Sequence, residues 1–216
     1  MAIFYNPRIV TDGLVLALDA GNTKSYPGSG TTWTDLSGRG NNGTLVGSPT
    51  YSSSNGGEII LNGTTQYIDV PTPNLSATNY TVFCASRYNT SPSGRIINGY
   101  SNNWLVGHWG ATTENYYAEG WVSSVSAGAG DTNYRIHSAT GDISLDSYQL
   151  FVNGTLTAGP NTVGSQGPNG FGIGRYAPGN SEYSNARVSF LFAYNRVLTA
   201  AEVSQNFNAL RSRFSI

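Results

Sequence analysis

The segment that most constrains the fold is residues 188–197, VSFLFAYNRV, near the end of the chain. Its length and its apolar, aromatic and β-branched content indicate a long buried strand. If the strand alternates regularly, Val188, Phe190 and Phe192 face one side and Leu191 faces the other. A strand that is apolar on both faces requires a cover on each side, so we expect packed layers.

A single helix is predicted directly after this strand. Thr199 and Glu202 have the spacing of a capping box, in which each side chain satisfies a backbone N–H at the helix start. Apolar residues then recur at the spacing of one helix face, at Val203, Phe207, Leu210 and Phe214.

Before residue 199 the chain has only short apolar or alternating runs, separated by Gly, Pro, Asn and Ser. The pairs Asn62-Gly63 and Asn153-Gly154 signal tight hairpin turns, the first between strands expected at 57–61 and 66–70. We therefore predict an all-β fold, a two-sheet antiparallel jelly-roll sandwich with one short C-terminal helix. Residues 1–11 are expected to form an arm and residues 12–216 one domain.

Composition limits the partners. Charged residues make up 11% of the chain and the formal net charge is −1, so we expect neither nucleic acid nor membrane as a partner. The one cysteine excludes a disulfide within the chain. The first residues, MAIFYNPRIV, have no basic region followed by a long apolar run, so we expect synthesis in a host cytoplasm without a signal peptide.

Four segments, taken in order, resemble laminin-G-like, concanavalin A-like jelly-roll domains. They are residues 35–44 (DLSGRGNNGT), 61–71 (LNGTTQYIDVP), 151–154 (FVNG) and 194–202 (YNRVLTAAE). Together they extend the resemblance from residue 12 to residue 214. It implies the same jelly-roll sandwich that the strand pattern predicts.

The opening segment resembles a narrower group. Residues 7–33, from PRIVTDG to TTW, look like the version of this domain found in structural proteins of tailed bacteriophages, including cyanophages. The resemblance implies a non-enzymatic virion protein, located in the particle and oligomeric on it, with other capsid or tail proteins as partners. Capsid decoration is the preferred role, because the chain has no long shaft. The alternative is a lectin-like module of a tail or fibre protein that recognises host surface polysaccharide.

The sequence offers no set of catalytic residues. Glucanases of this fold carry paired carboxylates on one strand face, about 5 Å apart for a retaining mechanism. Glu114 and Glu119 are the nearest acidic pair, and their odd spacing places them on opposite faces of a strand. His108, His137 and Cys84 match no nucleophile motif. We expect no enzymatic activity and no cofactor, with calcium as the exception to consider.

Calcium requires several oxygen ligands, often from loop carboxylates. The candidate ligands are Asp35 and Asn41 in residues 35–44, called the signature loop here, and Asp142 and Asp146 farther along the chain. The alternative is that Asp35 and Asn41 cap turns through side chain-to-backbone hydrogen bonds. We favour this alternative, because the chain has no dense Asp-x-Asp loop.

Aromatic residues gather in the middle third of the chain. Rings exposed on a sheet face could stack on sugar rings, and the candidates for carbohydrate binding are Trp104, Trp109, Tyr117 and Trp121. Two alternatives remain: packing within the core, which strand aromatics do well, and contact with another protein. Alternation predicts that about half of these rings point inward.

Overall fold

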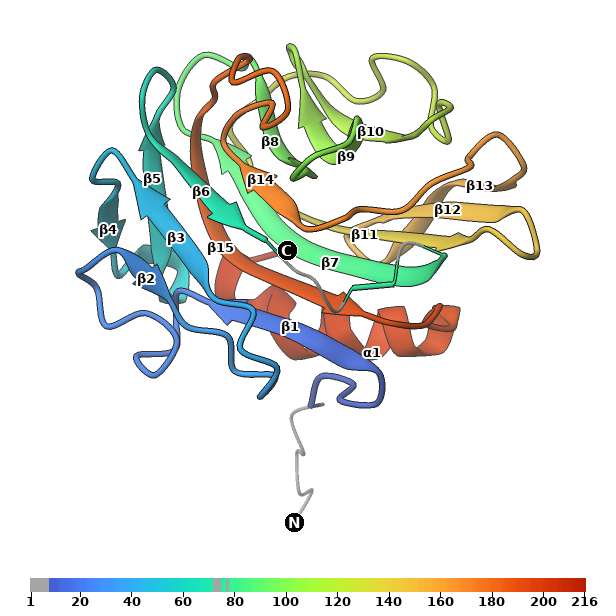
Figure 1. Ribbon diagram of the computed structural model, residues 1–216, viewed down its shortest axis with the longest axis horizontal. Coiled ribbons are helices and arrows are strands. Elements are labelled where there is room, and N and C mark those ends of the chain that lie inside the picture. Colours follow the sequence, from blue (N-terminus) through green and yellow to red (C-terminus); the bar gives the residue numbers. More distant parts are fainter. Residues whose placement is uncertain (1–7, 72–74, 77) are drawn as a thin grey trace.

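The computed structural model describes residues 8–71, 75–76 and 78–216 and shows two antiparallel β-sheets with one α-helix (Figure 1). This confirms the predicted fold class. Of the expected arm, residues 1–7 lie outside the described residues.

The larger sheet, called sheet A here, has eight strands. Seven follow one another in the order β13 (Thr155–Asn161), β12 (Ser147–Val152), β11 (Arg135–Asp142), β7 (Asn79–Tyr88), β15 (Asn185–Tyr194), β5 (Glu58–Asn62) and β4 (Thr50–Ser52). β1 (Leu14–Asp19) also pairs with β15. β5 pairs with the first part of β15 and β1 with the rest, so both lie along the same edge of this long strand.

The smaller sheet, called sheet B here, has seven strands. Their order is β10 (Thr112–Ala118), β9 (Trp104–Trp109), β8 (Arg95–Gly99), β14 (Phe171–Ile173), β6 (Tyr67–Val70), β3 (Gly43–Val46) and β2 (Thr32–Trp33). The main hydrophobic core lies between the two sheets and contains fully buried rings such as Trp33, Tyr80, Trp104 and Phe171.

β15 departs from the regular alternation that the sequence predicts. A register shift between Val188 and Phe190 marks a bulge, which inserts one extra residue into the strand. Val188 therefore lies with Leu191 in the core between the sheets, whereas Phe190 and Phe192 lie on the outer face of sheet A. The prediction that placed Val188 beside the two phenylalanines was wrong for this reason.

Helix α1 (Ala200–Leu210) and the 3-10 turn η2 (Arg211–Phe214) cover the outer face of sheet A. The capping box is present: Glu202 N–H donates to Thr199 Oγ1, and Thr199 N–H donates to Glu202 Oε2 at 2.9 Å. Val203, Leu210 and Phe214 are buried against the sheet. No helix among the described residues is long and apolar enough to cross a membrane.

The two Asn-Gly turns have different outcomes. Asn153 and Gly154 have positive φ values and join the paired strands β12 and β13, as predicted. The hairpin expected at Asn62-Gly63 is wrong, because β5 belongs to sheet A and β6 to sheet B. Asn62 Oδ1 accepts the backbone N–H groups of residues 64–66, so the turn carries the chain from one sheet to the other.

Candidate functional site

Three aromatic rings lie together on the outer face of sheet B, the face directed away from the core. Trp109 is the last residue of β9, Tyr117 is in β10, and Trp121 follows β10. The ring centroids of Trp109 and Trp121 are 5.0 Å apart, and those of Tyr117 and Trp121 are 5.2 Å apart. All three side chains are partly exposed. We call Trp109, Tyr117 and Trp121 the aromatic platform.

The turn after β10 brings Trp121 beside Tyr117. Glu119 has a φ of 61°, and a backbone bridge links Tyr117 to Trp121. Between them, Gly120 lies so close to the Val163 carbonyl that an added Cβ would be 1.9 Å from its oxygen. Only glycine fits at this position, so the close approach of the chain at residue 163 depends on it.

Polar groups border the platform at Trp109. The indole Nε1–H of Trp109 donates to Glu182 Oε2 at 3.1 Å, and Arg95 Nε is 2.7 Å from the same oxygen. Arg95 also donates to Asn103 Oδ1 at 2.6 Å and lies 4.3 Å above the Tyr176 ring centroid. These contacts hold Trp109 in a fixed orientation and neutralise the Glu182 carboxylate.

Tyr117 supplies a hydroxyl at the other side of the platform. Burial and the nearby charge and hydrogen bond of Glu119 raise the pKa of Tyr117 above its usual value. The phenol therefore stays protonated at neutral pH and can donate a hydrogen bond.

The prediction that Trp104 belongs to a surface site was wrong. Its exposed fraction is 0%, and its ring packs in the core against Tyr80, Tyr116 and Phe171. The indole N–H donates to Tyr80 Oη at 3.1 Å. Trp104 and Trp109 are five residues apart on one strand, so they face opposite sides of sheet B. The spacing alone could have separated them.

Glu182, Arg95 and Tyr176 were not predicted as site residues. Glu182 and Tyr176 are in the loop after β14, which reaches the platform only because β14 pairs with β8 in sheet B. No local pattern in the sequence marks this approach.

Asp35 and Asn41 have the structural role that we favoured. Asp35 Oδ1 accepts the backbone N–H groups of Ala17 and Ser37 at 2.8 and 2.9 Å, and its Oδ2 accepts that of Asn41 at 3.0 Å. Asn41 Nδ2 donates to the Val15 carbonyl at 2.7 Å. The signature loop is therefore fastened to β1 by these two side chains, and the Asp35 carboxylate already has backbone donors on both oxygens.

The other two calcium candidates lie at the turn between β11 and β12. Asp142 Oδ1 accepts hydrogen bonds from Ser144 Oγ and Leu145 N–H at 2.7 and 3.0 Å, and these bonds lower the Asp142 pKa. Asp146 has a φ of 48° in the same turn. Among residues 8–71, 75–76 and 78–216, no three His, Cys, Asp or Glu side chains form a group that could hold a metal ion. Calcium binding at these positions stays a prediction.

The buried histidines and the cysteine lie within the fold. The rings of His108 and His137 are 5.2 Å apart, and both side chains are inaccessible to solvent. Burial lowers the pKa of His137 to about 4 and that of His108 well below its usual value. Burial also raises the pKa of the Cys84 thiol to about 12. These groups are neutral at pH 7 and have no contact with solvent.

Comparison with known proteins supports the fold. No family model matches the chain, and no curated protein matches it. Domain 4 of AbnA, a GH43 extracellular arabinanase from Geobacillus stearothermophilus solved in complex with arabinotriose, is similar in structure. It has a TM-score of 0.63 and 15% identity, and the match covers 89% of this chain and 97% of that domain.

Two toxin structures are also similar. The binding domain of Paraclostridial Mosquitocidal Protein 1 has a TM-score of 0.65 and 16% identity, with 92% of this chain and 52% of that one covered. A botulinum neurotoxin type C structure, described as dependent on interaction with two ganglioside molecules for cell entry, has a TM-score of 0.64 and 12% identity. That match covers 93% of this chain and 52% of the other, so this chain spans about half of each toxin structure. The shared feature is the β-sandwich fold.

Proposed function

We propose that this chain is a non-catalytic carbohydrate-binding domain and that the aromatic platform is its binding surface. The observation that carries the proposal is the cluster of Trp109, Tyr117 and Trp121 on the outer face of a sheet, with rings about 5 Å apart and partly exposed. Sugar rings have apolar C–H faces and polar edges, so they suit rings that combine an apolar body with a polar group.

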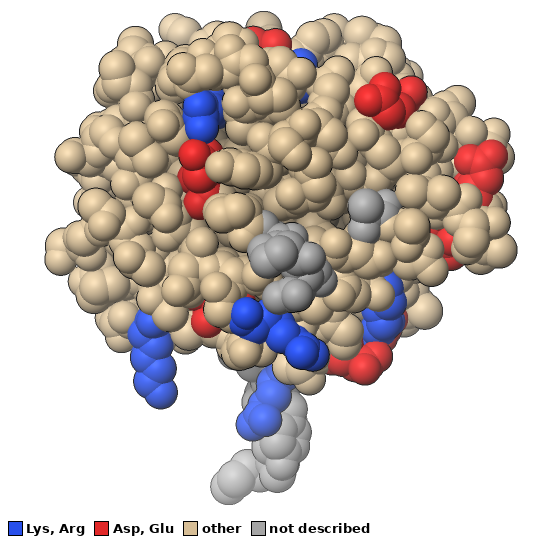
Figure 2. Space-filling view, in the orientation of Figure 1, with Lys and Arg blue, Asp and Glu red and all other residues tan. Residues whose placement is uncertain are grey.

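Charge favours a neutral glycan. Arg95 in β8 and Arg175, which follows β14, are paired with Glu182 and Asp69 at 2.7 and 2.9 Å. They are therefore engaged and do not offer free cations to an acidic sugar. Figure 2 shows one face of the molecule, on which charged residues are scattered over a mostly uncharged surface.

Two structural neighbours support a glycan as the class of ligand. One was solved with arabinotriose, and another is described in terms of gangliosides. The first carries more weight, because the match covers 97% of that domain, whereas it covers only 52% of the toxin structure.

The proposal can be tested by screening the protein on a glycan array and then measuring the affinity for each bound glycan by calorimetry. We expect saturable binding of a neutral oligosaccharide, weakened about tenfold or more by Trp109→Ala or Trp121→Ala, which corresponds to about 1.4 kcal/mol or more of binding free energy. Leu145→Ala is the matched control, because it removes an exposed apolar side chain from a turn of sheet A. Equal affinity in wild type and both tryptophan variants would exclude the platform, and turnover of the glycan would exclude a non-catalytic role.

A second proposal concerns where the domain acts. We propose a phage particle, with capsid decoration preferred over a tail or fibre position, and with virion proteins and host glycans as partners. The resemblance of residues 7–33 to tailed-phage proteins supports it. Labelling and cryo-microscopy of purified particles test it: density for this domain on the capsid is expected, and its absence from every particle surface would contradict the proposal.

A further inference from the structure

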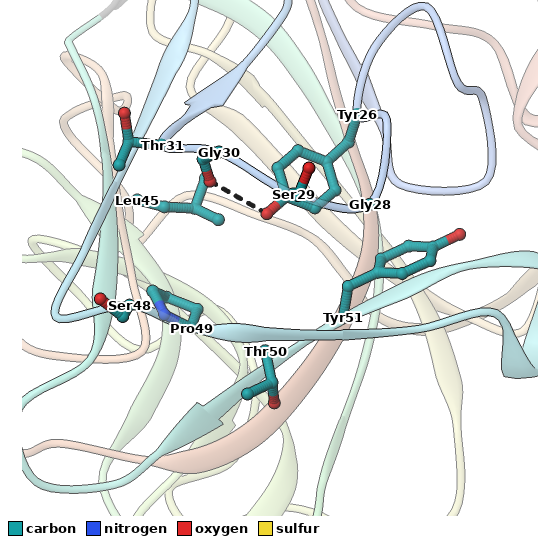
Figure 3. Close-up of a pocket in the computed structure, with 10 residues that line it drawn as sticks. All are labelled: Tyr26, Gly28, Ser29, Gly30, Thr31, Leu45, Ser48, Pro49, Thr50 and Tyr51. Atoms are coloured by element: carbon teal, nitrogen blue, oxygen red, sulfur yellow. Dashed lines mark hydrogen bonds between the residues drawn. The ribbon is translucent and has the colours of Figure 1, made fainter.

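A pocket lies at the other end of sheet B from the aromatic platform. It has a volume of about 380 Å³ and is enclosed by the loop over residues 26–31, by β3 and by the segment 48–51 that leads into β4 (Figure 3). β3 and β2 end the strand order of sheet B, and β4 ends that of sheet A, so the hollow lies where the end strands of both sheets meet. The aromatic platform lies at the opposite end of sheet B, at β9 and β10, which begin its strand order. We call this hollow the Tyr26–Tyr51 pocket.

Two aromatic rings shape the pocket. The ring centroids of Tyr26 and Tyr51 are 5.8 Å apart and the rings are tilted by 55°, so they form a notch rather than a flat stack. Tyr26 is 2% exposed, and its hydroxyl donates to the Gly30 carbonyl at 3.1 Å. Leu45 and Pro49 complete the apolar lining. Because Tyr26 is already fixed, the pocket is formed before a ligand arrives.

Glycine keeps the notch open. Gly28 has a φ of 92°, and an added Cβ would be 3.3 Å from the Tyr51 ring. A larger residue would be strained in this conformation and would press against the ring. The Gly28 position therefore determines how closely the loop approaches Tyr51.

The polar groups of the pocket are uncharged hydroxyls. Ser29 and Ser48 line it, and neither side-chain hydroxyl bonds to another described residue. No lining residue is ionisable at neutral pH, so a charged ligand would lose hydration without a compensating partner. The volume is near the lower end of the range of small-molecule sites, about 300–1,000 Å³. Apolar rings bordered by free hydroxyls suit a small neutral ligand with both apolar and hydroxyl-bearing faces.

We propose that the Tyr26–Tyr51 pocket is a second saccharide site, which takes one or two neutral sugar units and is separate from the platform. This inference rests on the proposed function, because it assumes that the ligand is a glycan. Two sites at opposite ends of one sheet would let one domain bind a polysaccharide at two points. Linked sites raise overall affinity through effective concentration without any new contact.

The experiment measures the two sites separately. Neutral di- to tetrasaccharides of glucose, galactose, mannose, xylose and arabinose are titrated by calorimetry and by saturation-transfer NMR. The proteins are wild type, the platform variant Trp109→Ala/Trp121→Ala, and the pocket variants Tyr51→Ala and Ser29→Trp. Ser29→Trp blocks the pocket without removing a core side chain, because Ser29 is exposed. Thermal unfolding confirms that each variant is folded.

We expect the platform variant to keep residual binding of a short neutral oligosaccharide, at least tenfold weaker than that of wild type. Either pocket substitution in that background should weaken this residual binding at least tenfold again. Binding to the corresponding immobilised polysaccharide should fall at least tenfold when either site alone is removed. Loss of all sugar binding in the platform variant, with binding intact in wild type, would overturn the pocket proposal and leave the proposed function standing.

Other outcomes separate the two claims further. Binding that survives removal of the platform and disappears in Tyr51→Ala would support the pocket and overturn the platform as the main site. Preference of the pocket for acidic over neutral sugars would overturn the ligand chemistry proposed for it. Absence of binding in every protein, wild type included, would overturn both proposals.

Discussion

The outer faces of the two sheets both carry aromatic residues, but the chain covers only one of them with a helix. On sheet A, Phe83 and Phe190 stack with centroids 6.0 Å apart, and Phe190 and Phe192 stack at 4.9 Å. All three are buried under α1 and η2. On sheet B, Trp109 and Trp121 approach as closely, at 5.0 Å, and remain partly exposed.

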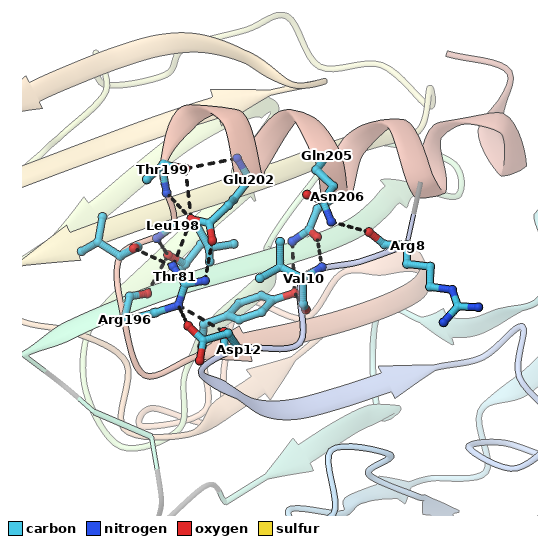
Figure 4. Close-up of polar contacts among 12 residues, drawn as sticks. Arg8, Val10, Asp12, Thr81, Arg196, Leu198, Thr199, Glu202, Gln205 and Asn206 are labelled. Carbon is cyan, nitrogen blue, oxygen red and sulfur yellow. Dashed lines mark hydrogen bonds and ion pairs between the residues drawn. The ribbon is translucent and has the colours of Figure 1, made fainter. Parts of the chain in front are cut away.

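The cover of sheet A is fastened by polar contacts at its edge (Figure 4). Asn206, on the helix, accepts the Val10 N–H at 2.7 Å and donates to Tyr194 Oη at 3.0 Å, and Tyr194 Oη donates to the Val10 carbonyl at 3.0 Å. Arg196 pairs with Glu202 at 2.5 Å and with Asp12 at 2.8 Å. Residues 8–12 and the helix are therefore held to the sheet together.

Aromatic residues therefore have two different roles on the two outer faces. Rings that the chain covers contribute to folding, because their apolar area is removed from water in the native state. Rings that the chain leaves partly exposed gain that contribution only when a ligand covers them. Substitution of a covered ring on sheet A should therefore lower the free energy of unfolding. Substitution of an exposed ring on sheet B should mainly lower the affinity for a ligand.

The largest expected effect is on the covered face. Phe190→Ala should lower the free energy of unfolding by about 3–5 kcal/mol, because a fully buried ring is lost from a packed cluster. Trp121→Ala should lower it by about 1 kcal/mol or less, since partly exposed positions contribute little. Urea unfolding followed by circular dichroism measures both. Equal losses in the two variants would contradict the comparison.

The next effect concerns the core that both faces share. His108 and His137 are buried as neutral rings, with Ser86 Oγ 3.2 Å from His108 Nδ1 and the Thr113 carbonyl 2.7 Å from His137 Nε2. The positive charge of Arg135 opposes protonation of both. The His137 pKa is about 4 in the folded state against 6.5 for the free group, so protons bind the unfolded chain more readily in this interval.

Stability should therefore be fully present above pH 6.5 and fall as the pH is lowered from 6.5 to about 4, by an amount on the order of 3 kcal/mol for His137 alone. Tryptophan fluorescence from sheet B and circular dichroism from the whole chain should change together, because the core lies under both faces. His137→Gln should reduce the dependence of the free energy of unfolding on pH between 6.5 and about 4. A stability that stays constant over this interval would contradict the assignment of neutral buried histidines.

The smallest effect on stability is expected at the start of helix α1, where Glu202 is part of the capping box. Hydrogen bonds from Arg196, and next those of Thr199, lower the pKa of Glu202 to about 2, against an ordinary value of 4.5. Its contribution to stability is present above pH 4.5 and is lost as the pH falls through about 2. Glu202→Gln should cost about 1 kcal/mol at pH 7, because the capping box and the ion pair weaken.

Thermal unfolding at pH 7 and at pH 2 measures this difference. The difference in melting temperature between wild type and Glu202→Gln should be smaller at pH 2 than at pH 7. Ligand binding to the platform at pH 7 should not change. A gap that is the same at both values would show that the carboxylate charge contributes nothing to holding the helix on sheet A.

Local signals in the sequence were sufficient for part of the structure. The capping box placed the start of the helix, and Asn153-Gly154 placed a hairpin, because both depend on backbone groups within a few residues. The period of two also separates Trp104 from Trp109, although the prediction did not apply it there. Of the platform, Trp109, Tyr117 and Trp121 were predicted together.

The all-β class, the single capped helix and the alternation of rings between two faces could be predicted from the sequence, since these follow from local conformation and side-chain period. Three features became apparent only in the folded chain: Asn62-Gly63 leads from sheet A to sheet B, the bulge after Val188 separates it from Phe190, and Glu182 contacts Trp109. The Tyr26–Tyr51 pocket likewise required both sheets. Such features depend on pairing between strands distant in the sequence, which no local pattern specifies.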